Sequence, residues 1–136
     1  MASPQTPLGS PFGYRSTARG YSGIGTLTVA ALASAGAQVL VGARRLDQAN
    51  EVLSALEGDI SALELDLSNP ALIDAFAAQV AEKWDRIDIL INNAAVFQRL
   101  DVLDATSLDN QLREIDINLA GSVRVTGVFL HELQRS

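Results

Sequence analysis

The stretch 16-STARGYSGIGTLTVAALASAGAQVLVGARR-45 decides the fold, because it joins a glycine-rich loop to a helix and then to a strand. Glycines at positions 20, 23 and 25 lead directly into an apolar-rich run. Glycines let the backbone approach a phosphate group closely, and the free N–H groups of a helix's first turn favour its negative charge. The loop alone is weak evidence, since glycine-rich turns before helices are also a common structural device.

The first helix is predicted to begin at Gly25 and to end at Gly36, which stands where a helix C-terminal glycine belongs. The apolar residues that fall on one face of this helix are Leu27, Ala31, Leu32 and Ala35. Residues 37–43 (AQVLVGA) then predict a short buried strand.

The same alternation continues along the chain. A second helix ends near Gly58, and strands are predicted at 60–67 (ISALELDL) and 86–95 (RIDILINNAA). Ser68 and Ser107 offer N-caps for two further helices, the second continuing towards Leu133. The apolar positions spaced for these three helices are Leu46, Ala49, Leu53 and Leu56, then Leu72, Phe76, Val80 and Trp84, then Leu108, Leu112, Ile115 and Leu119.

Helices and strands that alternate at these lengths predict an α/β fold, a Rossmann-like doubly wound parallel sheet. Residues 1–19 contain most of the prolines and no apolar run of strand length, so we expect an irregular N-terminal arm at 1–19 and a partial dinucleotide-binding domain at 20–136. Such a series should open with a strand, and the sequence before Gly20 does not show one.

The charge and the residue composition argue against several classes of binding partner and metal site. The 136 residues predict one domain, and a net charge of −6 argues against nucleic acid and anionic membrane surfaces as partners. With no cysteine and a single histidine, His131, no thiolate or histidine-based metal site is expected. The first ten residues lack the pattern of a signal peptide, so a cytoplasmic location is the expectation.

The end of the first predicted strand bears on the choice of nucleotide. About twenty residues after the glycine loop, dinucleotide folds place an acid for the ribose of NAD or an arginine for the 2′-phosphate of NADP. Here Ala43 is followed by Arg44 and Arg45 with no carboxylate. This favours NADP over NAD, although two solvated arginines at a strand end would give the same pattern.

Four motifs in order, YSGIG (21–25), DLS (66–68), ILINNAA (89–95) and DINLAG (116–121), resemble the N-terminal half of a short-chain dehydrogenase/reductase. The resemblance covers nearly all of the chain from Gly20 onward. It implies a Rossmann-type fold that binds NAD(P), in a family that transfers hydride to or from an alcohol or carbonyl group.

The resemblance also implies roles for individual residues. Ser22, Gly23, Ile24 and Gly25 would contact the pyrophosphate, and Arg44 the adenosine phosphate. Asp66 would bind the adenine amino group, Leu67 would line its pocket, and Asn93 and Ala94 would lie beside the cofactor. Asn118 matches the helix asparagine that holds a water in the family's proton relay. Taken singly, Asp66 could be a helix cap, Asn93 a turn former and Asn118 a polar residue of a kinked helix.

The sequence departs from the family in its catalytic residues. The family uses a tyrosine as general acid or base with a lysine four residues later, and a serine that stabilises the reacting oxygen. The two tyrosines, Tyr14 and Tyr21, are followed at that distance by Ala18 and Gly25, and the one lysine, Lys83, follows Gln79. We therefore expect no catalysis by these residues alone.

The second departure is the first strand. Ala18 and Arg19 occupy positions where the family has threonine and glycine, and the strand that should precede them is apparently missing. That strand would be the central one, and its loss would open a gap of about 10 Å lined by unpaired N–H and C=O groups. Either residues 11–19 fill the gap, or the flanking strands close up, or the sheet frays.

Three readings follow. The leading one is the cofactor-binding portion of an NADP-preferring short-chain oxidoreductase, with NAD possible and the substrate undetermined. The alternative is a catalytically dead nucleotide-binding or protein-interaction module. A third is an enzyme completed by a second chain. Many family members dimerise through the helix predicted at 107–133, so an exposed apolar stripe there would fit either alternative as a homo-oligomer contact.

Overall fold

The computed structural model describes residues 14–18, 23–84, 86–96 and 107–134. In this part of the chain, four parallel strands form one sheet in the order β3-β2-β1-β4. The strands are β1 (Tyr14–Ala18), β2 (Val39–Ala43), β3 (Ile60–Glu64) and β4 (Ile87–Ile91). The α/β class and the parallel sheet predicted from the alternation are confirmed.

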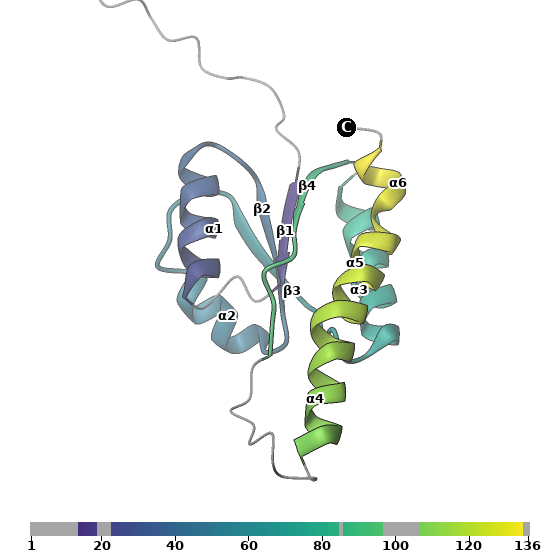
Figure 1. Ribbon diagram of the computed structural model, residues 1–136. Helices are drawn as coiled ribbons and strands as arrows, with labels where there is room; N and C mark the ends of the chain where they lie inside the picture. The colour runs from purple at the N-terminus through teal and green to yellow at the C-terminus, as the bar shows by residue number, and fades with distance from the viewer. Residues whose placement is uncertain (1–13, 19–22, 85, 97–106, 135–136) are drawn as a thin grey trace, which may run out of the picture.

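Helices cover both faces of the sheet. Two of them, α1 (Ile24–Ser34) and α2 (Leu46–Leu53), lie on one face (Figure 1). The opposite face carries α3 (Pro70–Lys83) and a nearly continuous helical segment. This segment consists of α4 (Ser107–Ile115), the π-helix η1 (Asp116–Gly121), α5 (Ser122–Val128) and α6 (Leu130–Leu133).

The central strand is present, so the prediction of a missing strand is wrong. Tyr14–Ala18 pairs in parallel with β2 on one side and β4 on the other, as the first of the three alternatives proposed. The expectation of an irregular arm at 1–19 is wrong for these five residues, and the rest of the arm lies outside the described residues. The physical reason lies in the space between β2 and β4. The backbone N–H and C=O groups that face this space need hydrogen-bond partners, and even a segment whose side chains do not follow a strand pattern can supply them.

Strand β2 forms the centre of two separate cores. All five of its residues are buried. Val39, Val41 and Ala43 pack with residues of α1 and α2, whereas Leu40 belongs to the cluster beneath α3 and α5. Burial on both faces explains why the predicted strand 37–43 is apolar without alternation.

The first helix buries a different face from the one expected. Its buried residues are Gly25, Val29 and Ala33, spaced four apart, while Leu27 is 71% exposed. The helix is apolar on nearly every side, so periodicity could not select the packing face. Its end was predicted correctly, because Gly36 follows it with a φ of 82°, a conformation that favours glycine.

The third helix confirms most of its predicted stripe. Phe76 and Val80 are buried, but Ile73 takes the place expected for Leu72. Its N-cap is Asn69 rather than Ser68, since the Asn69 side chain accepts a hydrogen bond from the Ala71 N–H at 3.0 Å. Ser68 instead donates to Asp66.

The long helix predicted from Ser107 to Leu133 is interrupted at two points. The π-helix η1 follows α4, and Phe129 lies between α5 and α6. Phe129 packs edge-on against Phe76, with ring centroids 5.8 Å apart, and both rings are buried. The leucines predicted for this helix lie on its outer side, where more than half of each side chain is exposed. The residues of this outer stripe are Leu108, Leu112, Ile115, Leu119, Val123 and Leu130.

Two glycines of this helical segment give a matched test of its packing. A Cβ at Gly121 would lie 2.8 Å from Leu67 Cβ and 2.9 Å from the Leu67 carbonyl oxygen, whereas one at Gly127 would meet nothing within 4 Å. We expect Gly121→Ala to lower the free energy of unfolding by about 1–3 kcal/mol through overpacking. Gly127→Ala should raise it by about 0.5–1 kcal/mol through helix propensity. Urea unfolding measures both, and equal effects would contradict the close contact.

Candidate functional site

The candidate site lies where the carboxyl ends of the strands meet. Because the strands are parallel, the residues that follow β2, β3 and β4 come together at one edge of the sheet, where parallel α/β folds bind ligands. A pocket opens at this edge, and Ile117 of η1 is among the residues that line it. The residues that line it are Arg44, Leu65, Asp66, Leu67, Ala94, Ala95, Val96 and Ile117.

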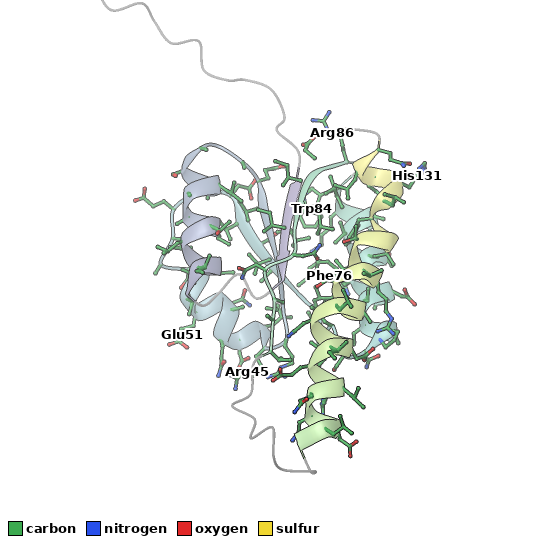
Figure 2. All side chains as sticks on the ribbon, viewed as in Figure 1. Arg45, Glu51, Phe76, Trp84, Arg86 and His131 are labelled. Atoms are coloured by element: carbon green, nitrogen blue, oxygen red, sulfur yellow. The ribbon has the colours of Figure 1, made fainter. Side chains whose placement is uncertain are left out.

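Two arginines labelled in Figure 2 lie at opposite edges of the sheet. Arg45, two residues after β2, lies at the lower edge of the view, and Arg86, directly before β4, lies at the upper edge. Arg86 is paired with Asp88 at 2.9 Å. Arg44 is exposed and has no ion pair among the described residues.

Asp66 is held in a fixed position by the residue two places along the chain. Its Oδ1 accepts hydrogen bonds from the Ser68 backbone N–H at 2.9 Å and from the Ser68 hydroxyl at 2.7 Å. Partial burial acts to raise the pKa of Asp66, but these two hydrogen bonds and the charges of Arg44 and Arg113 outweigh it and lower the pKa below 3.8. Asp66 is therefore ionised at neutral pH, and no bond to its Oδ2 is made by the described residues.

The walls of the pocket are apolar and well fixed. Leu65 and Leu67 are buried, and they flank Asp66 on the segment that follows β3. Gly42 of β2 allows Leu65 to lie close, because a Cβ at Gly42 would be 2.5 Å from the Leu65 Cδ2 atom. The pocket thus presents one carboxylate between apolar walls, with a cation at its rim.

The Asn118 side chain links the loop after β4 to the π-helix η1 by two hydrogen bonds. Its Oδ1 accepts from the Val96 N–H at 2.7 Å and its Nδ2 donates to the Val96 carbonyl oxygen at 2.8 Å. The Asn118 backbone carbonyl oxygen accepts from the Ser122 hydroxyl. Both ends of the side-chain amide are thus engaged, so Asn118 positions Ala94, Ala95 and Val96 at the pocket.

The glycine loop is described in part. Gly23 precedes α1 with φ 53° and ψ −125°, a backbone conformation that side chains disfavour. Gly25 is buried, and Ile24 is 76% exposed at the first turn of the helix. Ser22 lies outside the described residues.

The predicted site residues are thus brought together in two groups. Arg44, Asp66, Leu67 and Ala94 line one pocket, and half-buried Asn93 and Asn118 belong to the elements that frame it. Gly23, Ile24 and Gly25 stand at the start of α1. Sequence reasoning missed Ile117, although it directly precedes the asparagine of the DINLAG motif, and missed Leu65, Ala95 and Val96.

The described residues contain neither a membrane-spanning helix nor a metal-binding cluster. None of the helices in the described ranges is both long and apolar enough to cross a membrane. No group of three or more His, Cys, Asp or Glu side chains suited to a metal ion occurs among the described residues.

Comparison with known proteins gives consistent matches. Residues 19–136 match the family model described as short chain dehydrogenase. An uncharacterized oxidoreductase of Staphylococcus saprophyticus is 31% identical over 115 residues, covering 84% of this chain and 46% of that protein. Human dehydrogenase/reductase SDR family member 7 is 34% identical over 122 residues, which cover 84% of this chain and 36% of the human protein.

Solved structures agree. The crystal structure of gox2181 superposes with a TM-score of 0.85 at 26% identity, over 95% of this chain and 51% of that one. The chain therefore spans about half the length, or less, of the relatives it matches.

The Asn118 contact leads to a stability prediction. Asn118→Ala should lower the free energy of unfolding by about 2 kcal/mol, because it leaves the N–H and C=O of Val96 without partners. Asn92→Ala, which removes one exposed hydrogen bond to Thr126, should change it by less than about 0.5 kcal/mol. Urea unfolding measures both. Amide hydrogen exchange at Val96 should accelerate only in the Asn118 variant, and unchanged exchange there would contradict the assigned contact.

Proposed function

Because the chain belongs to the short-chain dehydrogenase family, we propose that residues 20–136 bind the adenosine half of NADP as the cofactor-binding portion of an oxidoreductase. The observation that carries the proposal is the pocket that joins Arg44, Asp66 and the apolar walls at the carboxyl edge of the sheet. When bound, the nicotinamide group supplies or accepts a hydride in reactions of this class.

The pocket's donor set fits an adenine ring. A flat base with an exocyclic amino group needs apolar walls and a hydrogen-bond acceptor, which Leu65, Leu67 and Ile117 and the ionised Asp66 would supply. In the proposed complex Ala94 and Asn93 lie along the cofactor, and Ser22, Gly23, Ile24 and Gly25 meet the pyrophosphate at the start of α1. Gly23 suits this role because its φ of 53° is a conformation that side chains disfavour, and it has no Cβ to keep a phosphate away from the backbone.

The preference for NADP over NAD rests on charge at the end of β2. An ionised carboxylate there would repel a 2′-phosphate, and the residues present are Arg44 and Arg45. Arg44 lines the pocket and has a planar guanidinium that can form paired hydrogen bonds with phosphate oxygens.

We propose a positioning role for Asn118. Its side chain holds the loop that carries Ala94 through the hydrogen bonds to Val96. Because the side chain is engaged there, a water of the family's proton relay would have to bind the Asn118 backbone carbonyl oxygen, which also accepts a hydrogen bond from the Ser122 hydroxyl. These 136 residues contain no tyrosine followed four residues later by lysine, so we expect binding of NADPH without its oxidation.

A binding or interaction module is the second candidate, and the outer stripe favours it. We propose that this stripe mediates homo-oligomerisation, since six large apolar side chains exposed along one helical segment are unusual on a monomer surface. Leu112→Glu in α4 should shift the purified protein to monomer in light scattering after gel filtration. Gln79→Glu, an exposed charge change on α3, should not. A wild-type monomer at all concentrations would remove this candidate.

The cofactor preference is tested by direct titration. Wild-type protein should enhance NADPH fluorescence saturably and bind NADPH more tightly than NADH. Arg44→Ala should weaken NADPH binding at least about tenfold, because a charged hydrogen bond is lost, with little effect on NADH.

Arg45→Ala serves as the control. It removes the same charge from the next residue, which does not line the pocket, so a much smaller loss is expected. Equal losses in the two variants would indicate long-range electrostatics rather than a contact at Arg44. No saturable binding of either dinucleotide would contradict the proposed function itself.

A further inference from the structure

In the helical segment from α4 to α6, residues spaced four apart form a line that runs from the core to the pocket. Phe129 and Val125 are buried in the core, Gly121 packs against Leu67, and Ile117 lines the pocket. The next position on this line is Arg113, one turn before Ile117. Arg113 and Ile117 are four residues apart, the spacing at which residues share one face of an α-helix, and the wider turn of η1 keeps Gly121 on that face as well.

The charge of Arg113 acts on the pocket. Together with Arg44 it lowers the pKa of Asp66, although the two arginines come from different elements. Neither arginine has an ion-pair partner among the described residues, whereas Arg86 pairs with Asp88 and Arg124 with Asp116. Two guanidinium groups therefore act on one carboxylate: Arg44 lines the pocket, and Arg113 lies one helical turn from the lining residue Ile117.

We propose that Arg113 is a specificity-determining residue that contacts the 2′-phosphate of NADP from the helical side, opposite Arg44 on the strand side. This proposal rests on the proposed function, because it assumes that the adenosine half occupies the pocket. A phosphate dianion is matched by two guanidinium groups and only half neutralised by one. One arginine is enough to neutralise the charge of Asp66, which leaves the second available to the phosphate.

The alternative role for Arg113 is to stabilise ionised Asp66. The two roles differ in their effect on the two cofactors. A phosphate contact strengthens only the dinucleotide that carries the 2′-phosphate, whereas stabilisation of Asp66 strengthens adenine binding in both. The ratio of the two affinities therefore separates them.

The experiment measures dissociation constants of the full chain for NADPH and NADH at low ionic strength, with adenosine 2′,5′-bisphosphate and 5′-AMP as competitors. Arg113→Ala should weaken binding of NADPH and of the bisphosphate by about fivefold, as for an exposed ion pair, and leave NADH and AMP nearly unchanged. Arg113→Lys should recover part of the loss. Arg124→Ala is the matched control, because Arg124 is an arginine of the same helical segment that pairs with Asp116 and is not among the charges acting on Asp66.

Each outcome decides the matter. Equal weakening of NADPH and NADH by Arg113→Ala would overturn the proposal in favour of support for Asp66, and no change in either would overturn it outright. If Arg44→Ala alone alters the ratio, the proposed function stands and this inference fails. If the wild type binds neither dinucleotide, both fail. Arg113 is exposed, so unfolding of the variant is not expected, and Arg113→Gln with a urea unfolding curve provides the check.

Discussion

The constraint on which the rest of the structure depends is hydrogen bonding in the central slot of the sheet. Strands β2 and β4 both present backbone groups towards that slot, and they are one strand's width too far apart to pair with each other. Tyr14–Ala18 satisfies both rows. Because this strand fixes the order β3-β2-β1-β4, it also fixes where the ends of β2, β3 and β4 converge.

The pocket depends in turn on two local contacts that hold irregular segments in place. Ser68 bonds to Asp66 and so defines the turn after β3, and Asn118 bonds to both backbone groups of Val96 and so defines the segment after β4. Loops at a sheet edge are ordinarily the most variable part of a fold. Here each is held by a short polar side chain, Ser68 within the turn itself and Asn118 from η1.

The sequence predicted the elements better than it predicted their faces. Strand β2 and the end of α1 at Gly36 could be predicted because their signals are local: a continuous apolar run and a glycine with positive φ. Strand β1 could not, because its pairing arises from its two neighbours and not from its own pattern. The buried face of α1 could not either, since a helix that is apolar all round gives no periodic signal.

The site followed the same division. Motif positions after the strands were enough to predict that Arg44, Asp66, Leu67 and Ala94 share one site, while their contacts with the cofactor are a proposal. Ile117 required knowledge of how the last helical segment is oriented, which depends on η1. Once that orientation is known, the residues that lead from the core to the pocket can be identified by their spacing. Residues four apart stay on one side of the segment because the π-turn offsets the rotation that this spacing produces in an α-helix.

The same π-helix also separates the two surfaces of this segment. Val125 and Phe129 anchor the inner line in the core, while the outer stripe, including Leu119 and Val123, stays exposed. Within η1, Asn118 bonds to the segment after β4 and Ile117 lines the pocket, while Leu119 is exposed in the outer stripe, so one short element contributes to both surfaces.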